Sequence, residues 1–217
     1  MTIPYIDIHT HQLQAEKDII QLLNCIVGKE ELPNGICSVG IHPWYINDEK
    51  EAQFELLKAY ASHENVLAIG ECGLDKITET DRNLQVETFE KQIQLANALQ
   101  KPLILHCVRA YQEVFALLKE QKAGVPVLFH GFNKKAELAQ SILQQGYYIS
   151  LGPSILQGNQ DDLIHGVDLH KIFLETDDKS SKVLDIYSYF CTGRKISLAD
   201  LQEQIDKNCQ RVFRYNT

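Results

Sequence analysis

The sequence predicts an α/β protein, a (β/α)8 barrel of the TIM type that is trimmed in its first two βα units. Eight apolar runs of strand length occur along the chain, and helical patterns separate the later ones. Strands that alternate with helices predict parallel strands joined by right-handed crossovers. A histidine or carboxylate stands at the end of several runs, where barrel enzymes place their active sites. Eight strands favour a closed barrel over an open doubly wound sheet.

The apolar runs have the length and the boundaries of strands. They comprise residues 3–8, 19–27, 36–41, 66–69, 102–105, 125–129, 147–151 and 172–174. The segment Gln12–Asp18 is too short for a crossover helix before the second run. The connection from Val27 to Ile36 is also short. The early barrel is therefore irregular, unless the second run is not a strand.

Helices are predicted from apolar residues spaced three and four apart. One spans residues 86–99 and ends before Pro102, which a helix interior does not tolerate. A second spans residues 134–145, with Gly146 as a C-terminal cap. The last begins after Ser197, a good N-cap residue, and continues to about Val212.

Composition indicates one globular domain over residues 1–217, since the chain has 44% hydrophobic and 23% charged residues. No run approaches the ~20 apolar residues that a bilayer span needs, and no basic segment leads into an apolar one near Met1. We therefore expect a soluble, cytoplasmic protein without a membrane partner. The six cysteines form no C-x-x-C pair and are expected to be buried thiols.

The net charge of −8 bears on nucleic-acid partners. Proteins that grip duplex DNA by its phosphates normally present a basic face. No run of Lys or Arg provides one here, so no stable duplex-binding surface is expected. An anionic substrate must then be held locally, by metal.

Six residues of the kind that bind first-row metals lie at the carboxyl ends of predicted strands. Imidazole and carboxylate suit zinc, manganese or iron. Because barrel strands all end at one face, ligands from distant parts of the chain can meet there. The candidates are His9 and His11 in D-I-H-T-H, Glu71 in G-E-C-G-L-D, His106 in L-I-L-H-C, His130 in V-L-F-H-G and Asp177 in L-E-T-D-D. The pattern indicates a metal-dependent hydrolase.

Six such ligands exceed what one tetrahedral zinc ion needs. We expect two divalent ions, roughly 3.5–4 Å apart, bridged by a carboxylate and a hydroxide. Glu71 is the expected bridge. Such a pair brings the pKa of the bridging water to around neutrality and neutralises charge on a scissile phosphoryl or carbonyl oxygen. Asp177 is expected to bind one ion and to orient or deprotonate the water.

The same segments, in the same order, resemble the TatD family of metal-dependent deoxyribonucleases, within the amidohydrolase-like barrels. The resemblance implies one ion on His9, His11 and Asp177 and another on His106 and His130, with Glu71 as the bridge. It also implies hydrolysis of DNA or short oligonucleotides, as an exonuclease or related phosphodiesterase using magnesium, manganese or zinc. The motifs that carry it are D-I-H-T-H, G-I-H-P, G-E-C-G-L-D, K-P-L-I-L-H-C, H-G-F, G-Y-Y-I-S-L-G, L-E-T-D and N-x-x-R-V-F, from Tyr5 to Phe213.

Two features depart from the family. Family members often carry an arginine two places after the fourth-motif histidine, where this chain has Val108, followed by Arg109. The segments Gln12–Asp18 and Asp178–Lys182 are shorter than in the family. These loops are expected to shape the substrate cleft, so the metal centre is better supported than the substrate.

Residues near the ligands have expected roles of their own. His42 ends the third run and is expected to contact a phosphate or the leaving group. Trp44 is expected to cover the core rather than to stack on a base. Asp7 and Asp75 either accept hydrogen bonds from ligand imidazoles or close turns.

Further charged residues are expected at the periphery of the site. Glu175 shares a strand face with Asp177 and so can contact either ion. Lysines either guide an anion to the site or form solvated surface. They are Lys134, Lys135, Lys179 and Lys182.

Two other functions stay open. The first keeps the metal centre but cleaves an amide or carboxylic ester, such as a lactone, of a small molecule. The second is a degenerate barrel that binds a metal, nucleotide or partner without catalysis. A lost ligand would mark the second, and all six are present. Metal content separates a nucleotide- or partner-binding module, which would hold no ion, from a hydrolase holding two ions per chain.

Overall fold

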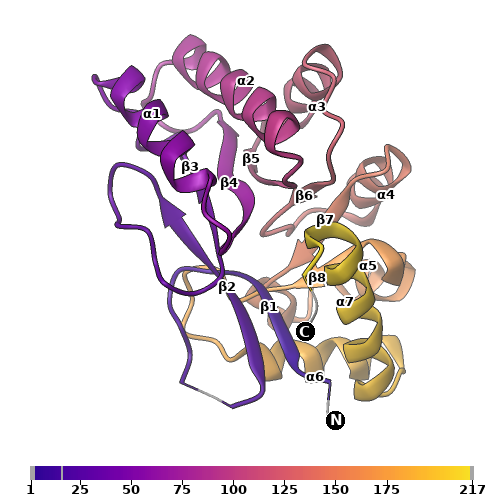
Figure 1. Ribbon diagram of the computed structural model, residues 1–217. Coiled ribbons are helices and arrows are strands. Elements are labelled where there is room, and N and C mark those ends of the chain that lie inside the picture. The colour runs from indigo at the N-terminus through magenta and orange to yellow at the C-terminus, as the bar shows by residue number, and fades with distance from the viewer. Residues whose placement is uncertain (1–2, 16, 216–217) are drawn as a thin grey trace. The chain divides into compact units, whose positions relative to one another are not determined.

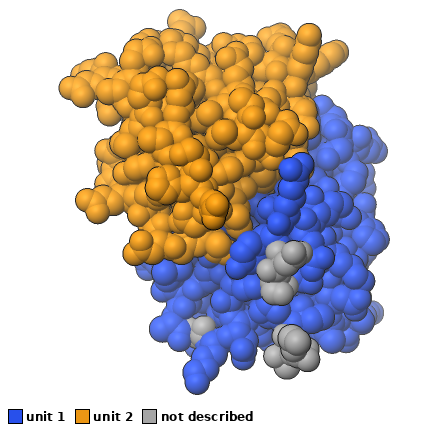
Figure 2. Space-filling model, in the orientation of Figure 1, with its two compact units in different colours: residues 1–23, 129–217 blue, residues 24–128 orange. Residues whose placement is uncertain are grey.

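The structure is a computed structural model that describes residues 3–15 and 17–215 of the chain. Its contacts form two compact units, shown in different colours in Figure 2. Unit 1 combines residues 1–23 with residues 129–217, and unit 2 comprises residues 24–128. The single domain expected over residues 1–217 stays a prediction. Within the segment Gln12–Asp18, Glu16 lies outside the described residues.

The strands follow the chain order in the sheet, and the registered pairs β1–β2, β3–β4, β4–β5 and β7–β8 are parallel. Their bounds are β1 Tyr5–Thr10, β2 Ile19–Ile26, β3 Cys37–Gly40, β4 Val66–Asp75, β5 Leu103–Val108, β6 Val127–Phe129, β7 Tyr148–Leu151 and β8 Ile172–Leu174.

Helices follow the strands from β3 onward. The α-helices are α1 Lys50–Ala61, α2 Arg82–Leu99, α3 Tyr111–Glu120, α4 Ala136–Gln144, α5 Asp161–Gly166, α6 Val183–Arg194 and α7 Leu198–Phe213. Two short 3-10 helices, η1 Pro153–Gln157 and η2 Leu169–Lys171, complete the set within the described residues. No described helix lies between β1 and β2 or between β2 and β3.

In unit 2, α1, α2 and α3 lie along the strands β3, β4 and β5 (Figure 1). The helix α2 begins at Asp81, whose carboxylate accepts a hydrogen bond from the backbone N–H of Leu84 and so caps the first turn. Its apolar side, including Phe89 and Ile93, is fully buried. The contacts of α2 with β4 and of α3 with β5 support the two strands that carry Glu71, Asp75 and His106.

β4 and β5 approach each other closely at two glycines. Gly70 and Gly73 have φ angles of +151° and +134°, and a Cβ on either would collide with a carbonyl oxygen of β5, that of Ile104 or His106. Only glycine both adopts these φ angles readily and lacks the Cβ atom that would collide. β4 therefore continues to Asp75, beyond the run of residues 66–69 that the sequence predicts.

In unit 1, α6 and α7 pack on β1 and β8 (Figure 1). The helix α7 begins after Ser197, whose hydroxyl accepts from the N–H of Asp200, as the sequence predicts. β1 and β8 also contact each other, and Thr10 pairs with Asp177 beyond the end of β8. Contact between the first and last strands is what a (β/α)8 barrel requires.

The predicted elements agree closely with the structure. The second apolar run forms β2, so the open question about residues 19–27 is settled in favour of a strand, and the early part is irregular as expected. The predicted helix at residues 134–145 starts slightly later, at Ala136, and Gly146 lies just past its C-cap with a φ of +88°.

Buried thiols are confirmed at Cys25, Cys37, Cys72 and Cys209. Burial raises the pKa of Cys37 to about 11, so that this thiol stays protonated at neutral pH. No described helix is long and apolar enough to cross a membrane. The expected location in the cytoplasm stays a prediction.

Candidate metal-binding site

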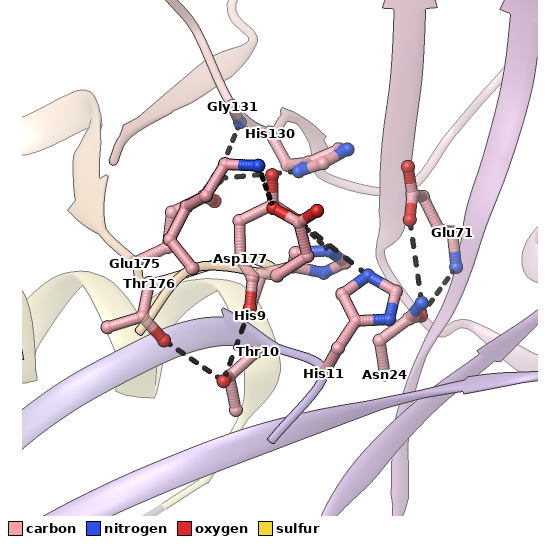
Figure 3. Close-up of polar contacts among 12 residues, drawn as sticks. His9, Thr10, His11, Asn24, Glu71, His130, Gly131, Glu175, Thr176 and Asp177 are labelled. Carbon is pink, nitrogen blue, oxygen red and sulfur yellow. Dashed lines mark hydrogen bonds and ion pairs between the residues drawn. The ribbon is translucent and has the colours of Figure 1, made fainter. Parts of the chain in front are cut away.

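In unit 1, three residues of β1 and its end contact the segment that follows β8. Asp7 and His9 are fully buried, whereas the His11 side chain is 22% exposed. Asp7 contacts Thr176. Both imidazoles approach Asp177 (Figure 3). Alternation along a strand places Asp7, His9 and His11 on one face, as predicted.

Asp177 is held by the backbone as well as by its side chain. Its N–H donates to the carbonyl oxygen of His9 at 2.9 Å, and the N–H of His11 donates to its carbonyl oxygen at 3.0 Å. Its φ of +57° lies in the left-handed region, which aspartate tolerates better than most residues. This backbone brings Oδ1 to 3.7 Å from Nε2 of His9 and 3.6 Å from Nε2 of His11.

His130 follows β6 and joins the same group, since its ring centroid lies 4.2 Å from that of His9. Nδ1 of His130 lies 3.4 Å from Oε1 of Glu175, which also accepts the N–H of Gly131 at 2.8 Å. The Ser150 hydroxyl donates to the other carboxylate oxygen. Glu175 thus fixes the orientation of the candidate ligand His130 through its Nδ1 atom.

Burial would raise the pKa of the Glu175 carboxyl, but the charge and hydrogen bond of His130, with smaller contributions from His9 and Ser150, hold it below its usual value. The carboxylate is therefore ionised at neutral pH. When His130 gives up one proton to bind a metal, an ionised Glu175 beside Nδ1 keeps the remaining proton on that atom, which leaves Nε2 as the atom able to bind the ion.

Asp7 serves the backbone rather than an imidazole. Its carboxylate accepts the N–H of Thr176 at 2.9 Å and the Thr176 hydroxyl at 2.7 Å. Burial raises the pKa of Asp7 to about 7, against the lowering effect of these two hydrogen bonds. Of the two roles that the sequence leaves open for Asp7, the structure supports the fixing of a turn.

In unit 2, Glu71 of β4 lies among two imidazoles and an amide. Its Oε1 is 2.8 Å from Nδ1 of His106 and 3.2 Å from Nε2 of His42. The Oδ1 atom of Asn24 accepts the backbone N–H of Glu71 at 3.0 Å, and its Nδ2 lies 3.5 Å from Oε2 (Figure 3). Glu71 is therefore buried and positioned on both its backbone and its side chain.

His106 has a carboxylate on each side, since Nε2 lies 2.9 Å from Oδ2 of Asp75. Asp75 also accepts the indole N–H of Trp44 at 2.6 Å and the N–H of Ile77 at 2.9 Å. Burial would raise the pKa of Asp75, but these partners, with His106 first, hold it below its usual range. Asp75 thus accepts from a ligand imidazole, one of its two predicted roles.

Both units contain a donor set that fits a divalent ion. In unit 1, ligand atoms of His9, His130 and Asp177 lie within 4.8 Å of one another. In unit 2, the same holds for His42, Glu71 and His106. Imidazole nitrogens with one carboxylate are a ligand set that suits zinc and manganese. The number of ions, their identity and the bridging role of Glu71 stay predictions.

The structure places His42 beside Glu71 and His106, which adds a candidate ligand that the sequence analysis assigned to substrate. Trp44 is 50% exposed and its ring packs against the imidazoles of His42 and His106, so its role as a cover of the core stays a prediction. Arg109 lies just beyond the end of β5, with a φ of +54°, and its side chain is exposed. The strand has therefore ended before the arginine.

Sequence reasoning missed the residues that hold the candidate ligands in place. Asn24, Ser150 and Thr176 are buried polar residues within or next to strands. A polar residue that interrupts an apolar run, such as Asn24 in residues 19–27, was the available signal. Its partner, Glu71, is distant in sequence, so the contact between the two residues could not be predicted from this signal.

An open groove lies in unit 1 beside the segments that follow β6 and β7. It has a volume of about 840 Å³. Its lining includes Lys134 and Lys135 from the β6–α4 connection, and Gln160 and Asp162 from the start of α5. Both lysines are exposed, and they belong to the connection that follows His130 along the chain.

Strand order, the contact of β1 with β8 and the histidine–carboxylate groups at strand ends define a metal-dependent hydrolase of the (β/α)8 class. The profile of the TatD related DNase family matches residues 10–214. The chain belongs to this family.

Individual relatives agree with this assignment. The uncharacterized metal-dependent hydrolase YabD of Bacillus subtilis is 26% identical over 197 residues, covering 82% of this chain and 77% of YabD. The mouse protein named putative deoxyribonuclease TATDN3 is 30% identical over 167 residues, covering 69% of this chain and 56% of that protein.

Among solved structures, the TatD homologue YJJV of Escherichia coli K12 superimposes with a TM-score of 0.83 at 19% identity, covering 99% of this chain and all of the other (100%). At this identity the similarity shows the fold. It confirms the predicted (β/α)8 barrel, trimmed in its first two βα units.

Proposed function

We propose that this protein is a phosphodiesterase that uses two divalent ions to hydrolyse DNA or short oligonucleotides. The observation that carries the proposal is the position of Asp177, with Oδ1 3.7 Å and 3.6 Å from the Nε2 atoms of His9 and His11. A carboxylate beside two imidazoles can both bind an ion and accept a proton from an attacking water. Family membership and the names of relatives such as TATDN3 support DNA as the substrate.

One ion would be held by the unit 1 donors His9, His11, His130 and Asp177, so that His130 joins the ion of His9, beside which it lies, rather than that of His106 as the family resemblance implies. The other would be held by the unit 2 donors Glu71 and His106, with His42 beside them. Divalent ions bound there would lower the pKa of water and neutralise charge on the phosphoryl oxygens. Asp177 would orient the water and take its proton, while Glu175 and Asp75 keep His130 and His106 in the orientation that exposes a ring nitrogen.

The groove beside Lys134 and Lys135 supports a substrate longer than one phosphodiester. Its lining includes part of the connection that follows His130, which suits the flanking part of a single strand, and two lysines attract phosphate groups. The net charge of −8 makes such a local attraction more important, because the protein as a whole repels a polyanion. Single strands and short oligonucleotides are therefore the proposed substrates, rather than long duplex DNA.

The test is hydrolysis of single-stranded DNA by chelator-stripped protein to which magnesium, manganese or zinc is added back. A model phosphodiester is assayed in parallel, and metal content is measured on each sample. The His106→Ala variant provides the comparison, and His63→Ala, which changes a histidine at the end of α1, is the matched control. We expect cleavage that metal restores, that His63→Ala retains and that His106→Ala loses.

Protein that holds two ions per chain yet cleaves no phosphodiester with any metal would reject the proposal. Amides and lactones would then be assayed, because the same donors also polarise a carbonyl oxygen. Protein that binds no ion at all would favour the non-catalytic alternative.

A further inference from the structure

Trp44 is the single tryptophan of the chain, and its position is unusual for so large an apolar side chain. It is 50% exposed, although most large hydrophobic side chains of the described residues are buried. It follows His42 by two residues, in the segment between β3 and α1. An indole that stays half in water beside a polar site, rather than in the core, has a surface available to a ligand.

The indole is nevertheless held in one orientation. Its Nε1–H donates to Oδ2 of Asp75 at 2.6 Å, and the Trp44 backbone N–H donates to Nδ1 of His42 at 3.1 Å. The ring also packs nearly perpendicular to two imidazoles, at centroid distances of 5.0 Å from His42 and 5.7 Å from His106. A fixed ring loses little conformational entropy when a ligand binds.

The ring therefore lies beside the candidate ligands His42, Glu71 and His106, all within unit 2. A substrate whose phosphodiester lies at that donor set would place an adjacent group against the exposed part of the indole. In an oligonucleotide that group is a nucleobase, and every base has a flat π-face that stacks on an aromatic ring.

We propose that Trp44 is a specificity-determining residue that stacks on a nucleobase next to the scissile phosphodiester. This inference rests on the proposed function and adds which part of the oligonucleotide the protein recognises, a base beside the scissile bond. Asp75 connects the two parts of the site, because one of its oxygens accepts from both Trp44 and His106. The stacking ring and the candidate ligand are thereby fixed to the same carboxylate.

The first test uses the fluorescence of the protein, which comes from Trp44 when tryptophan is selectively excited. The magnesium-loaded full chain is titrated with a short phosphorothioate oligothymidylate, which resists hydrolysis. An abasic oligomer of the same length, built on tetrahydrofuran phosphorothioates, is the matched ligand without bases. We expect saturable quenching by the first and none by the second at equal concentration.

The second test compares kcat/KM for the ordinary phosphodiester forms of the two oligomers. Stacking on one base predicts that the wild type prefers oligothymidylate by at least about fivefold. In Trp44→Leu this ratio falls to near one. Because it is a ratio, it is insensitive to any general loss of activity caused by removing the bond to Asp75. Trp44→Phe, which keeps a π-face without the N–H, retains part of the preference, and Tyr60→Leu in α1 keeps all of it.

Equal kcat/KM values for both oligomers with active wild-type protein would overturn the inference and leave the proposed function standing. A ratio that Trp44→Leu leaves unchanged while both rates fall would also overturn it, and would place Trp44 among the residues that position His106. Absence of cleavage of any phosphodiester would reject the proposed function. Base-dependent quenching in that same protein would still support a nucleotide-binding role for Trp44.

Discussion

The hydroxyl of Tyr187 donates to the carbonyl oxygen of Ile6 at 3.0 Å and accepts the backbone N–H of the same residue at 3.1 Å. Both residues are buried, in α6 and in β1. One phenol thus satisfies both backbone groups of a strand residue that lies next to Asp7. The helix behind β1 thereby fixes the strand that supplies two of the candidate ligands.

Replacing Tyr187 with Phe is expected to lower the free energy of unfolding by about 1–3 kcal/mol. The change leaves buried backbone groups of Ile6 without their partner, which is more unfavourable than the mean value of a hydrogen bond. Urea unfolding measures the effect. Tyr189→Phe, in the same helix but with a hydroxyl on the exposed Asp161, is the control and should change stability little. Equal stability of the two variants would contradict the expectation.

Glu71→Gln is expected to lose at least one ion and to lower kcat by about 100-fold or more, while the protein stays folded. The substitution keeps the volume but removes the charge that lies 2.8 Å from His106 and 3.2 Å from His42. Metal content and turnover are measured on the same sample. Glu79→Gln, at an exposed position beyond β4, is the control. Normal activity in Glu71→Gln would remove Glu71 from the set of ligands.

Asp177→Asn is expected to abolish most turnover, by roughly 100-fold or more, because the amide cannot accept the proton of the attacking water. It also removes the negative charge beside His9 and His11. The neighbouring carboxylate Asp178 pairs with Lys179 at the surface, so Asp178→Asn is a control of equal charge change. If the two variants had the same activity, Asp177 would have no special role.

Glu175→Gln is expected to weaken metal binding by about 10–100-fold without changing a proposed ligand. The carboxylate accepts from the Gly131 N–H, the Ser150 hydroxyl and His130, whereas a glutamine must turn an NH2 group toward one of these donors. The measurement is zinc affinity by competition with a chelator. Ser154→Ala, in η1, is the control. Unchanged affinity would show that His130 needs no support from Glu175.

Much of the fold follows from local sequence. The apolar runs, Ser197 at a helix start and Gly146 at a helix end each act within a few residues, so the sequence predicts them well. The end of β4 could not be predicted this way. Gly70 and Gly73 resemble breakers of a strand, but they are needed because β5 approaches, and that contact is not visible in a local pattern.

The site shows the same division. The positions of His9, His106 and Asp177 at strand ends follow from periodicity alone. The pairing of His42 with Glu71, and of Trp44 with Asp75, depends on how the loop after β3 directs its side chains toward β4. A short loop can aim a side chain either way, so the sequence could indicate that these residues matter but not which partner each would have.

Unit 1 is built from two separate stretches of chain, and this affects how the polypeptide folds as it is synthesised. Residues 24–128 form one continuous stretch, so every contact within unit 2 is available before the final ninety or so residues leave the ribosome. β1, by contrast, precedes unit 2 along the chain, while β8, α6 and α7 follow it. The contacts of His9 and His11 with Asp177 therefore cannot form until the segment after β8 has been synthesised. The nascent chain stays incomplete at this site until its C-terminal helices emerge, which leaves a hydrophobic N-terminal strand as the segment most in need of protection.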